Sequence, residues 1–256
     1  MECSQGLALL DSSSIDLTIT SPPYDDIRDY YGYKFDYEHF KKIAHELYRV
    51  TKKGGVVVWI VNDKTYKHSE SGTSFRQALY FIEIGFKLYD TMIFAKKDPS
   101  PKNHRRYEQS FEYMFILSKG RPTTFNGIKT VCKNKGKKRY GTYRHDKKGE
   151  LTKLNTIGYV SEEKLITNVW LYNVDNNSIT KDKEAHGHSA IFPEQLVEDH
   201  LKTWSNEGDI VLDIFMGSGT VAKMAYLNNR NYIGFEISKE YCNIAEQRLR
   251  KYISKD

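Results

Sequence analysis

The segment between residues 208 and 236 constrains the fold more than any other part of the chain. An apolar run (210–213) leads into a loop with a Gly-x-Gly turn (214–220), then a helical stretch (221–227) and a second apolar stretch (231–236). These lengths and patterns predict a strand, a loop, a helix and a second strand. Such a unit is typical of a nucleotide-type cofactor site in a doubly wound parallel sheet.

The polar residues of this unit indicate which ligand it suits. Gly217 and Gly219 allow the backbone to approach a ligand, and Glu236 closes the second strand 23 residues after Asp213. A carboxylate in that place accepts hydrogen bonds from ribose hydroxyls. The loop has no third glycine and no Gly-Lys-Ser/Thr, so pyrophosphate and triphosphate are poor candidates. We expect a nucleoside-type cofactor.

A second motif, Thr20-Ser21-Pro22-Pro23-Tyr24, follows the alternating stretch 15–19. Two consecutive prolines end a strand and stiffen the loop, because they donate no backbone hydrogen bond and hold φ fixed. The loop offers a hydroxyl, a rigid carbonyl and an aromatic ring, which suit a planar NH2-bearing substrate such as a nucleobase turned out of its stack. Taken alone, such a stretch is more often an ordinary loop or a polyproline recognition segment than a catalytic site.

Together, the two motifs resemble those of the DNA amino-methyltransferases that use S-adenosylmethionine. The catalytic motif of that family reads Asp, Asn or Ser, then Pro-Pro and an aromatic residue, as in 21–24; its cofactor motif usually reads Asp-Pro-Phe-x-Gly-Ser-Gly-Thr. Here Ile214 replaces the usual proline. The catalytic motif precedes the cofactor motif, as in the permuted β group. Weaker matches lie at 46–60, 106–120 and 188–196.

The resemblance implies an α/β fold with a doubly wound, mostly parallel sheet of the Rossmann-like class I methyltransferases. Residues 1–120 would form the catalytic half of the core and residues 186–256 the cofactor half, with an inserted basic target-recognition region at 121–185. Both motifs leave the carboxyl ends of strands, where ligands bind in open parallel sheets. One active site can therefore form if the two strands are neighbours.

For the catalytic loop, the resemblance implies that the Ser21 hydroxyl and the Pro22 carbonyl accept hydrogen bonds from the amine of the target base. Pro23 would fix the loop and Tyr24 would stack on the base. A serine hydroxyl is too weak a base to remove a proton at neutral pH, so we expect Ser21 to act as an acceptor.

The resemblance also implies S-adenosyl-L-methionine as cofactor. Asp213 would meet the methionine amine and Glu236 the ribose hydroxyls. Phe215 and Ile237 would flank the adenine or the sulfonium, and Glu2 occupies the place of an aspartate that contacts adenine. The remaining expected cofactor residues are Ser189, Phe192, Pro193, Gly217, Ser218, Gly219 and Thr220. Phe192 and Pro193 are equally typical of a core contact at a helix start.

Basic residues are concentrated between 129 and 148, interleaved with tyrosines. A charge run in general is most often a solvated loop. In a DNA enzyme, such side chains neutralise phosphates and release counterions. We therefore expect this insertion to bind double-stranded DNA at a short recognition sequence. The expected DNA-binding residues are Arg105, Arg106, Lys133, Lys135, Lys137, Lys138, Arg139, Tyr140, Tyr143 and Arg144.

The first catalytic residue bears on which base is methylated. Ser at that position resembles the cytosine-N4 group, whereas adenine-N6 enzymes more often have Asp; both groups accept the required hydrogen bond, so adenine N6 stays an alternative. An RNA or protein-glutamine methyltransferase is a further alternative, since those substrates also present a planar NH2. A non-catalytic DNA-binding module would not need Asp213, the glycines and Glu236 at this spacing.

Composition limits the other classes. No run of 18 apolar residues and no N-terminal signal pattern occurs, so we expect a cytoplasmic protein without a membrane partner. The three cysteines and the histidines show no metal-ligand spacing, so no metal is expected. From the resemblance we also expect the protein to form a homodimer and to belong to a restriction-modification system with a cognate restriction endonuclease.

Overall fold

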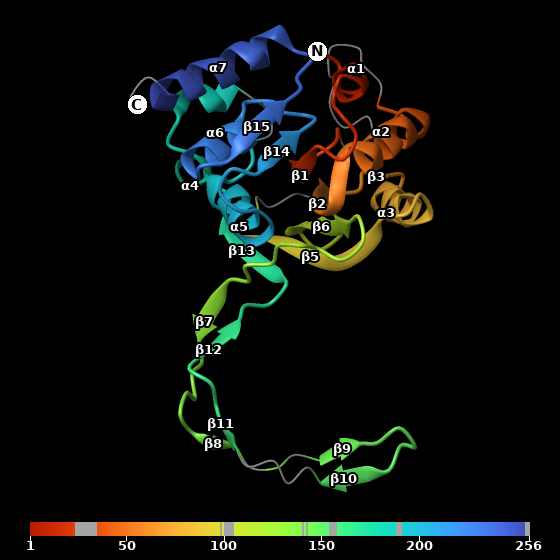
Figure 1. The fold of residues 1–256 in the computed structure, drawn as a ribbon, viewed down its shortest axis with the longest axis vertical. Coiled ribbons are helices and arrows are strands. Elements are labelled where there is room, and N and C mark those ends of the chain that lie inside the picture. Colours follow the sequence, from red (N-terminus) through yellow and green to blue (C-terminus); the bar gives the residue numbers. More distant parts are fainter. Residues whose placement is uncertain are drawn as a thin grey trace. The chain divides into compact units, whose positions relative to one another are not determined.

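The computed structural model describes residues 1–23, 35–97, 99, 105–139, 141, 143–153, 158–187 and 191–253. The chain forms two compact units (Figure 1). The core unit comprises Met1–Asn126 and Asn168–Asp256, and the basic unit comprises Gly127–Thr167.

The core unit alternates strands and helices. Its strands are β1 (Ile15–Thr20), β2 (Thr51–Val61), β3 (Thr65–Tyr66), β4 (Ser69–Glu70), β5 (Lys87–Lys97), β6 (Phe111–Ser118), β13 (Val169–Asn173), β14 (Ile210–Asp213) and β15 (Asn231–Gly234). Its helices are α1 (Cys3–Ala8), α2 (Tyr37–Val50), α3 (Thr73–Glu83), α4 (Asn176–Ile179), the 3-10 helix η2 (Lys183–Gly187), α5 (Glu194–Trp204), α6 (Thr220–Leu227) and α7 (Lys239–Ile253).

Seven of these strands form one sheet in the order β13-β5-β6-β2-β1-β14-β15 (Figure 1). β6 runs antiparallel to both of its neighbours, and every other adjacent pair is parallel. The predicted fold class, a mostly parallel sheet with covering helices, is therefore confirmed. The two strands that carry the motifs, β1 and β14, are direct neighbours, with Leu17 beside Val211 and Thr18 beside Leu212.

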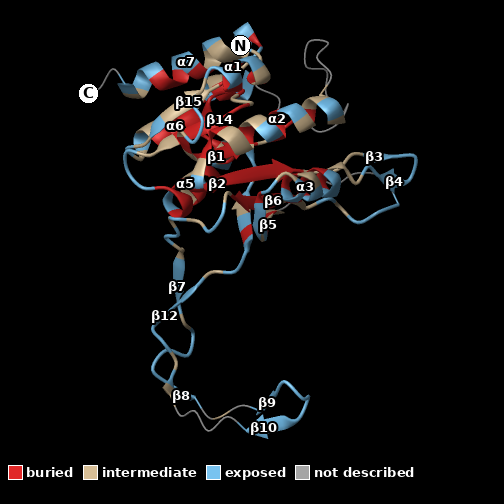
Figure 2. Cartoon of the chain, turned by 45° about the vertical axis from the view of Figure 1, so that its right-hand side comes forward, coloured by how far each residue is buried: buried red, intermediate tan, exposed pale blue. Residues whose placement is uncertain are grey.

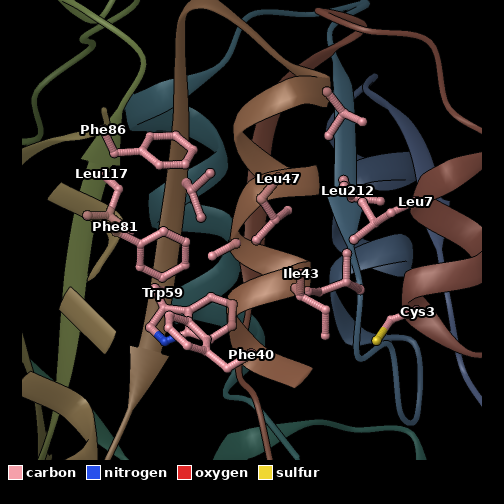
Figure 3. Close-up of a cluster of buried hydrophobic side chains, with 14 of the residues drawn as sticks. Cys3, Leu7, Phe40, Ile43, Leu47, Trp59, Phe81, Phe86, Leu117 and Leu212 are labelled. Atoms are coloured by element: carbon pink, nitrogen blue, oxygen red, sulfur yellow. The ribbon is translucent and has the colours of Figure 1, made fainter. Parts of the chain in front are cut away.

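One face of the sheet is covered by α1, α2 and α3, whose apolar side chains meet those of β2 and β6 (Figure 3). Helix α2 buries Phe40, Ile43, Ala44, Leu47 and Val50, which follow a helical spacing. Its N-cap is Asp36, which accepts a hydrogen bond from the backbone N–H of His39 at 2.8 Å. This packing fixes the helix that follows the catalytic loop.

The opposite face is covered by α5 and α6. Phe115 of β6 belongs to the cluster under α2 and α3, so Met114 points to the other side of the strand. There its Sδ lies 3.1 Å from Nε2 of His200 in α5. Helix α6 packs between α5 and α7 and against β14 and β15. Both faces are covered, which accounts for the fully buried run along β2 (Figure 2).

Helix α7 closes the core unit. Ser238 caps the start of the helix, since its Oγ accepts a hydrogen bond from the backbone N–H of Tyr241 at 3.3 Å. The helix runs over Lys239–Ile253 and buries Ala245, Arg248 and Leu249. The buried Arg248 donates a hydrogen bond to the Ser218 carbonyl in the glycine loop.

The basic unit is a set of nested two-stranded ladders. β7 (Lys129–Val131) pairs with β12 (Glu163–Leu165), β8 (Lys138–Arg139) with β11 (Gly158–Tyr159), and β9 (Tyr143–His145) with β10 (Leu151–Lys153). The residues of these strands are exposed, apart from the half-buried Gly158 (Figure 2). Residues 121–126 and 168–185 of the predicted insertion lie in the core unit, where β13 extends the main sheet.

Within the described ranges, none of the helices combines the length and the apolar character needed to cross a lipid bilayer.

Candidate active site

The catalytic and cofactor motifs meet at one edge of the sheet. β1 and β14 lie side by side and point in the same direction, so the Pro-Pro loop and the glycine loop leave adjacent carboxyl ends (Figure 1). From this pair the chain continues outward on both sides, from β1 to β2 and from β14 to β15. Ligands bind at such a switch point in open parallel sheets. The strands that carry the two motifs are therefore neighbours, which is the condition for one shared active site.

The Pro-Pro loop is held close to the body of the protein. Pro22 is buried, whereas Ser21 and Pro23 are half-buried at the end of β1. Tyr24, the predicted stacking residue, lies outside the described residues.

A buried hydrogen bond connects the two loops. The hydroxyl of Thr20, the last residue of β1, donates to Oδ1 of Asp213, the last residue of β14, at 2.7 Å. The backbone N–H of Phe215 donates to the same oxygen at 3.1 Å. Burial raises the pKa of Asp213 to about 7; Glu236 also raises it, while the bonds from Thr20 and Phe215 lower it. This carboxyl group therefore titrates near neutrality.

Glu236 holds the glycine loop from the other side. Its Oε2 accepts a hydrogen bond from the backbone N–H of Gly217, and its Oε1 accepts one from that of Ser238, both at 2.8 Å. The backbone N–H of Met216 donates to the Phe235 carbonyl at 2.9 Å. The predicted ribose-binding carboxylate is thus already aligned beside the loop that the cofactor would approach.

The Gly219 position cannot accept a side chain. Its φ is +77°, and an added Cβ would lie 2.8 Å from the Cβ of Ala245 in α7. Glycine is needed here both for the left-handed backbone and for the close packing of loop and helix.

The N-terminus lies at the same place. The amino group of Met1 donates to the Glu236 carbonyl at 2.5 Å. Oε1 of Glu2 lies 3.0 Å from Nε2 of His39, and its Oε2 accepts hydrogen bonds from the backbone of Ser4 and Gln5 at the start of α1. Burial raises the pKa of Glu2, but the bonds from Ser4, Cys3 and Gln5 outweigh burial and bring it to about 2. Glu2 is therefore a fixed anion near the cofactor strand.

Aromatic side chains lie beside these acids. The rings of Phe35 and Phe215 meet edge to face with centroids 5.4 Å apart, and Phe35 also contacts His39 at 5.7 Å. Ile237, predicted to flank the cofactor, is 38% exposed. Phe192 is half-buried and Pro193 is buried at the start of α5, while Ser189 lies outside the described residues.

The side chains of Ser218 and Thr220 point into the protein. Arg248 of α7, which is fully buried, donates to the Ser218 carbonyl at 2.6 Å and to both hydroxyls at 3.1 Å. Arg248 also pairs with Asp182 and Glu194, each at 3.0 Å. Lys223 of α6 pairs with the same two acids at 2.8 and 2.7 Å. This four-charge cluster supports the glycine loop from beneath.

The acids at the edge define what the site can hold. Asp213, Glu236 and Glu2 bring three carboxyl groups to one end of the sheet, around the glycine loop and beside aromatic rings. That combination fits a cationic ligand with ribose hydroxyls and a flat ring, and is unfavourable for a polyphosphate. It fits the predicted S-adenosylmethionine.

The predicted DNA-binding residues are divided between the units. Arg105 and Arg106 are exposed in the core unit, where Nη2 of Arg106 lies 3.8 Å from Oε1 of Glu70. Tyr140 lies outside the described residues. The others, all in the basic unit, are exposed: Lys133, Lys135, Lys137, Lys138, Arg139, Tyr143 and Arg144.

The basic unit contains eleven Lys and Arg against four Asp and Glu, a net charge of +7, while the whole chain carries +6. The remainder of the chain is therefore slightly acidic.

Two features of the site were missed by the sequence reasoning. The Thr20–Asp213 bond joins residues 193 positions apart, and Arg248 reaches acids 54 and 66 positions away. Both depend on which elements are neighbours in space. The one local indication was an arginine on the apolar face of the last helix.

Comparisons with known proteins agree with this geometry. Residues 15–247 match the family model N6_N4_Mtase, described as DNA methylase. The orphan methyltransferase M.BamHII of Bacillus amyloliquefaciens is 56% identical over 94% of this chain and 90% of its own length. The type II methyltransferase M.BglII of Bacillus subtilis is 31% identical over 93% of this chain and 64% of its own length.

Solved structures share the fold. PvuII DNA methyltransferase (cytosine-N4-specific) superposes with a TM-score of 0.71 at 20% identity, covering 97% of this chain and 84% of its own. TTHA0409 of Thermus thermophilus, named a putative DNA modification methylase, in complex with S-adenosyl-L-methionine, gives a TM-score of 0.61 at 20% identity, covering 98% of this chain and 92% of its own.

Proposed function

Since this chain belongs to the DNA methylase family that contains the N6- and N4-amino-methyltransferases, we propose that it transfers a methyl group from S-adenosylmethionine to N4 of cytosine in double-stranded DNA. The observation that carries the proposal is the meeting of the Ser21-Pro22-Pro23 loop and the glycine loop at the ends of β1 and β14. A base held by the first loop would face a cofactor held by the second.

The chemistry requires little beyond positioning. The exocyclic nitrogen of cytosine is a poor nucleophile, because its lone pair is delocalised into the ring. Ser21 Oγ and the Pro22 carbonyl would each accept a hydrogen bond from the amine. These bonds favour a pyramidal nitrogen and direct its lone pair toward the methyl group. The cofactor supplies an activated methyl group on a sulfonium. As the N–CH3 bond forms, the S–CH3 bond would break and S-adenosylhomocysteine would leave, after which the nitrogen would lose its excess proton to water. Proximity and orientation account for most of the rate.

The cofactor would be held by the acids and the glycine loop. Glu236, aligned by Gly217 and Ser238, would accept hydrogen bonds from the ribose hydroxyls. Asp213 would face the positively charged methionine end, and Glu2 with Ile237 and Phe215 would border the adenine. Phe192, Pro193, Ser189, Ser218 and Thr220 complete the proposed cofactor site.

The choice of cytosine rests on Ser21. A serine in the first catalytic position resembles the cytosine-N4 enzymes, and the PvuII methyltransferase, whose fold this chain shares, is named cytosine-N4-specific. Adenine N6 is the second candidate, since the same loop accepts either amine.

The basic unit supplies the proposed DNA contact and target recognition. Its charge of +7 within 41 residues would neutralise several phosphates, and Tyr143 and Tyr159 lie within its ladders. One relative is named an orphan methyltransferase and another a type II methyltransferase. We place this chain in the same restriction-modification context, as an enzyme that methylates without an obligatory nuclease partner.

Methylation of defined polymers would test the proposal. Purified protein with labelled S-adenosylmethionine should label duplex DNA, and digestion to nucleosides followed by mass spectrometry should show N4-methyldeoxycytidine. N6-methyldeoxyadenosine would move the assignment to adenine. Label in RNA or in a glutamine-containing peptide, with none in DNA, would overturn the substrate class.

A further inference from the structure

We propose that Thr20 is a positioning residue for methyl transfer: its hydroxyl bond to Asp213 sets the separation between the loop that holds the base and the loop that holds the cofactor. The inference rests on the proposed function. Thr20 itself precedes the catalytic motif and is not among the residues expected to touch either substrate.

The bond has the geometry of a structural link. Thr20 is fully buried and Asp213 is 3% exposed, so water does not compete for either group. The distance of 2.7 Å is typical of a hydroxyl donating to a carboxylate. Each residue ends its strand and is followed at once by one of the two loops: Ser21 comes after Thr20, and Ile214 after Asp213.

The link acts where the backbone ladder ends. The described pairing of β1 with β14 covers Leu17–Val211 and Thr18–Leu212, before either strand reaches its loop. Beyond these pairs the side-chain bond continues the connection into the site. Oδ1 of Asp213 also accepts from the backbone N–H of Phe215, so one oxygen is shared between β1 and the start of the glycine loop.

Methyl transfer depends strongly on such a separation. The amine nitrogen, the methyl carbon and the sulfur must lie in line at near-attack distance, and an error of about 1 Å costs about 100-fold in rate. Without the hydroxyl, the two loops could shift relative to each other while each kept its own ligand contacts. The expected defect is therefore in kcat more than in the KM for the cofactor.

The chain provides a closely matched control. Thr18 lies two residues earlier on β1, so its side chain is on the same side of the strand. Like Thr20 it is fully buried, but its hydroxyl has no hydrogen-bond partner among the described residues. Thr18→Val and Thr20→Val make the same chemical change at the same depth in the same strand, and only the second removes the link.

The test measures steady-state methylation of duplex DNA by the wild-type protein and by Thr18→Val, Thr20→Val and Thr20→Ser, normalised to the folded fraction. At about pH 9, well above the pKa of Asp213, Thr20→Val should lower kcat by about 10- to 100-fold with the KM for S-adenosylmethionine within about threefold. Thr18→Val should match the wild type. Thr20→Ser should restore most of kcat even if the lost methyl group lowers its melting temperature.

A pH profile separates positioning from simple destabilisation. The Thr20 hydroxyl lowers the pKa of Asp213, so its loss should raise that pKa and move the acidic limb of kcat/KM to higher pH. The groups that act on Asp213 are Thr20 on β1, the Phe215 amide and Glu236 after β15. Thr20→Ser should keep the wild-type profile.

The outcomes distinguish the two levels of the proposal. If the wild-type protein methylates DNA and Thr20→Val equals Thr18→Val in kcat, KM and pH profile, the positioning role is wrong and the proposed function stands. If the folded wild-type protein binds S-adenosylmethionine but methylates no DNA, the proposed function fails first.

Discussion

Asp213 is the residue whose ionisation should depend on the cofactor. Its pKa of about 7 means that the free protein holds a proton on this carboxyl group at pH 6. S-adenosylmethionine is a cation at its sulfonium and ammonium groups, so its binding favours the carboxylate and must release that proton. We expect the Kd at pH 6 to be about ten times that at pH 8.

Calorimetry in two buffers of different ionisation enthalpy would measure the release directly. About one proton should leave per cofactor at pH 6 and almost none at pH 8. Asp213→Asn should bind more weakly and lose the pH dependence. An unchanged pH dependence in Asp213→Asn would assign the effect to another group.

Asp213 and His200 should have opposite effects on the pH dependence of the stability of the free protein. Burial lowers the pKa of His200 to about 3 from 6.5, whereas that of Asp213 is raised to about 7 from 3.8. Between about pH 4 and 6.5 the unfolded chain carries the extra proton on His200 and the folded protein carries it on Asp213. The pKa shift of His200 alone would lower the free energy of unfolding by about 1.4 kcal/mol per pH unit on acidification. The shift of Asp213 alone would raise it by as much.

Urea unfolding at pH 4.5 and 6.5 would separate the two slopes. The contributions of these two groups should nearly cancel in the wild-type protein. Asp213→Asn should expose the histidine slope, so that stability falls with acidification, and His200→Asn should expose the opposite slope. Equal slopes in all three proteins would show that neither group titrates as its burial indicates.

At the scale of elements, the sequence predicted what is local. The strand, glycine loop, helix and strand of 210–236 follow from apolar runs and the breaks between them. The adjacency of β1 and β14 could not be read from local pattern, so the sequence left it as a condition that the structure meets. β13 was assigned to the insertion, because five residues with one buried tryptophan at a sheet edge leave little periodicity.

The cluster beneath the glycine loop is the element-scale feature that the sequence could not show. Arg248 and Lys223 are buried only because Asp182 and Glu194 come from distant segments to pair with them. Burial raises the pKa of Asp182, but its bonds from Lys223 and Arg248 outweigh burial and hold it below the usual value. The cluster therefore stays charged, and it joins α5, α6 and α7 to the loop.

Arg248→Met should destabilise the fold by about 3–5 kcal/mol, because it leaves the buried Asp182 and the half-buried Glu194 with one cation. It should also weaken S-adenosylmethionine binding, since the Ser218 carbonyl loses its donor. The control is Arg250→Met on the same helix, whose side chain is 77% exposed and pairs with Glu246. That change should cost less than about 0.5 kcal/mol. Similar urea midpoints for the two variants would contradict a structural role for the cluster.

For the whole molecule, charge is divided by unit. The basic unit carries +7 and the rest of the chain about −1, so attraction to a polyanion is concentrated in one 41-residue segment. The described ladders of this unit bury almost nothing, and isolated two-stranded ladders are marginally stable in water. The composition of the insertion predicted the charge, but a segment without an apolar core gives no pattern from which its ladders could be predicted.

This division predicts how DNA affinity depends on salt. Lys137→Gln/Lys138→Gln removes two exposed charges of the basic unit, and should lower the slope of log K against log salt by about 2. S-adenosylmethionine affinity should not change, because the proposed cofactor residues lie in the core unit. The control, Lys42→Gln/Lys53→Gln, removes two exposed charges from α2 and the amino end of β2, away from the strand ends that form the site. Its slope should equal that of the wild type in fluorescence anisotropy with a labelled duplex. An equal decrease of the slope in both double variants would mean that DNA affinity depends on net charge alone. It would contradict the assignment of the basic unit as the DNA-binding element.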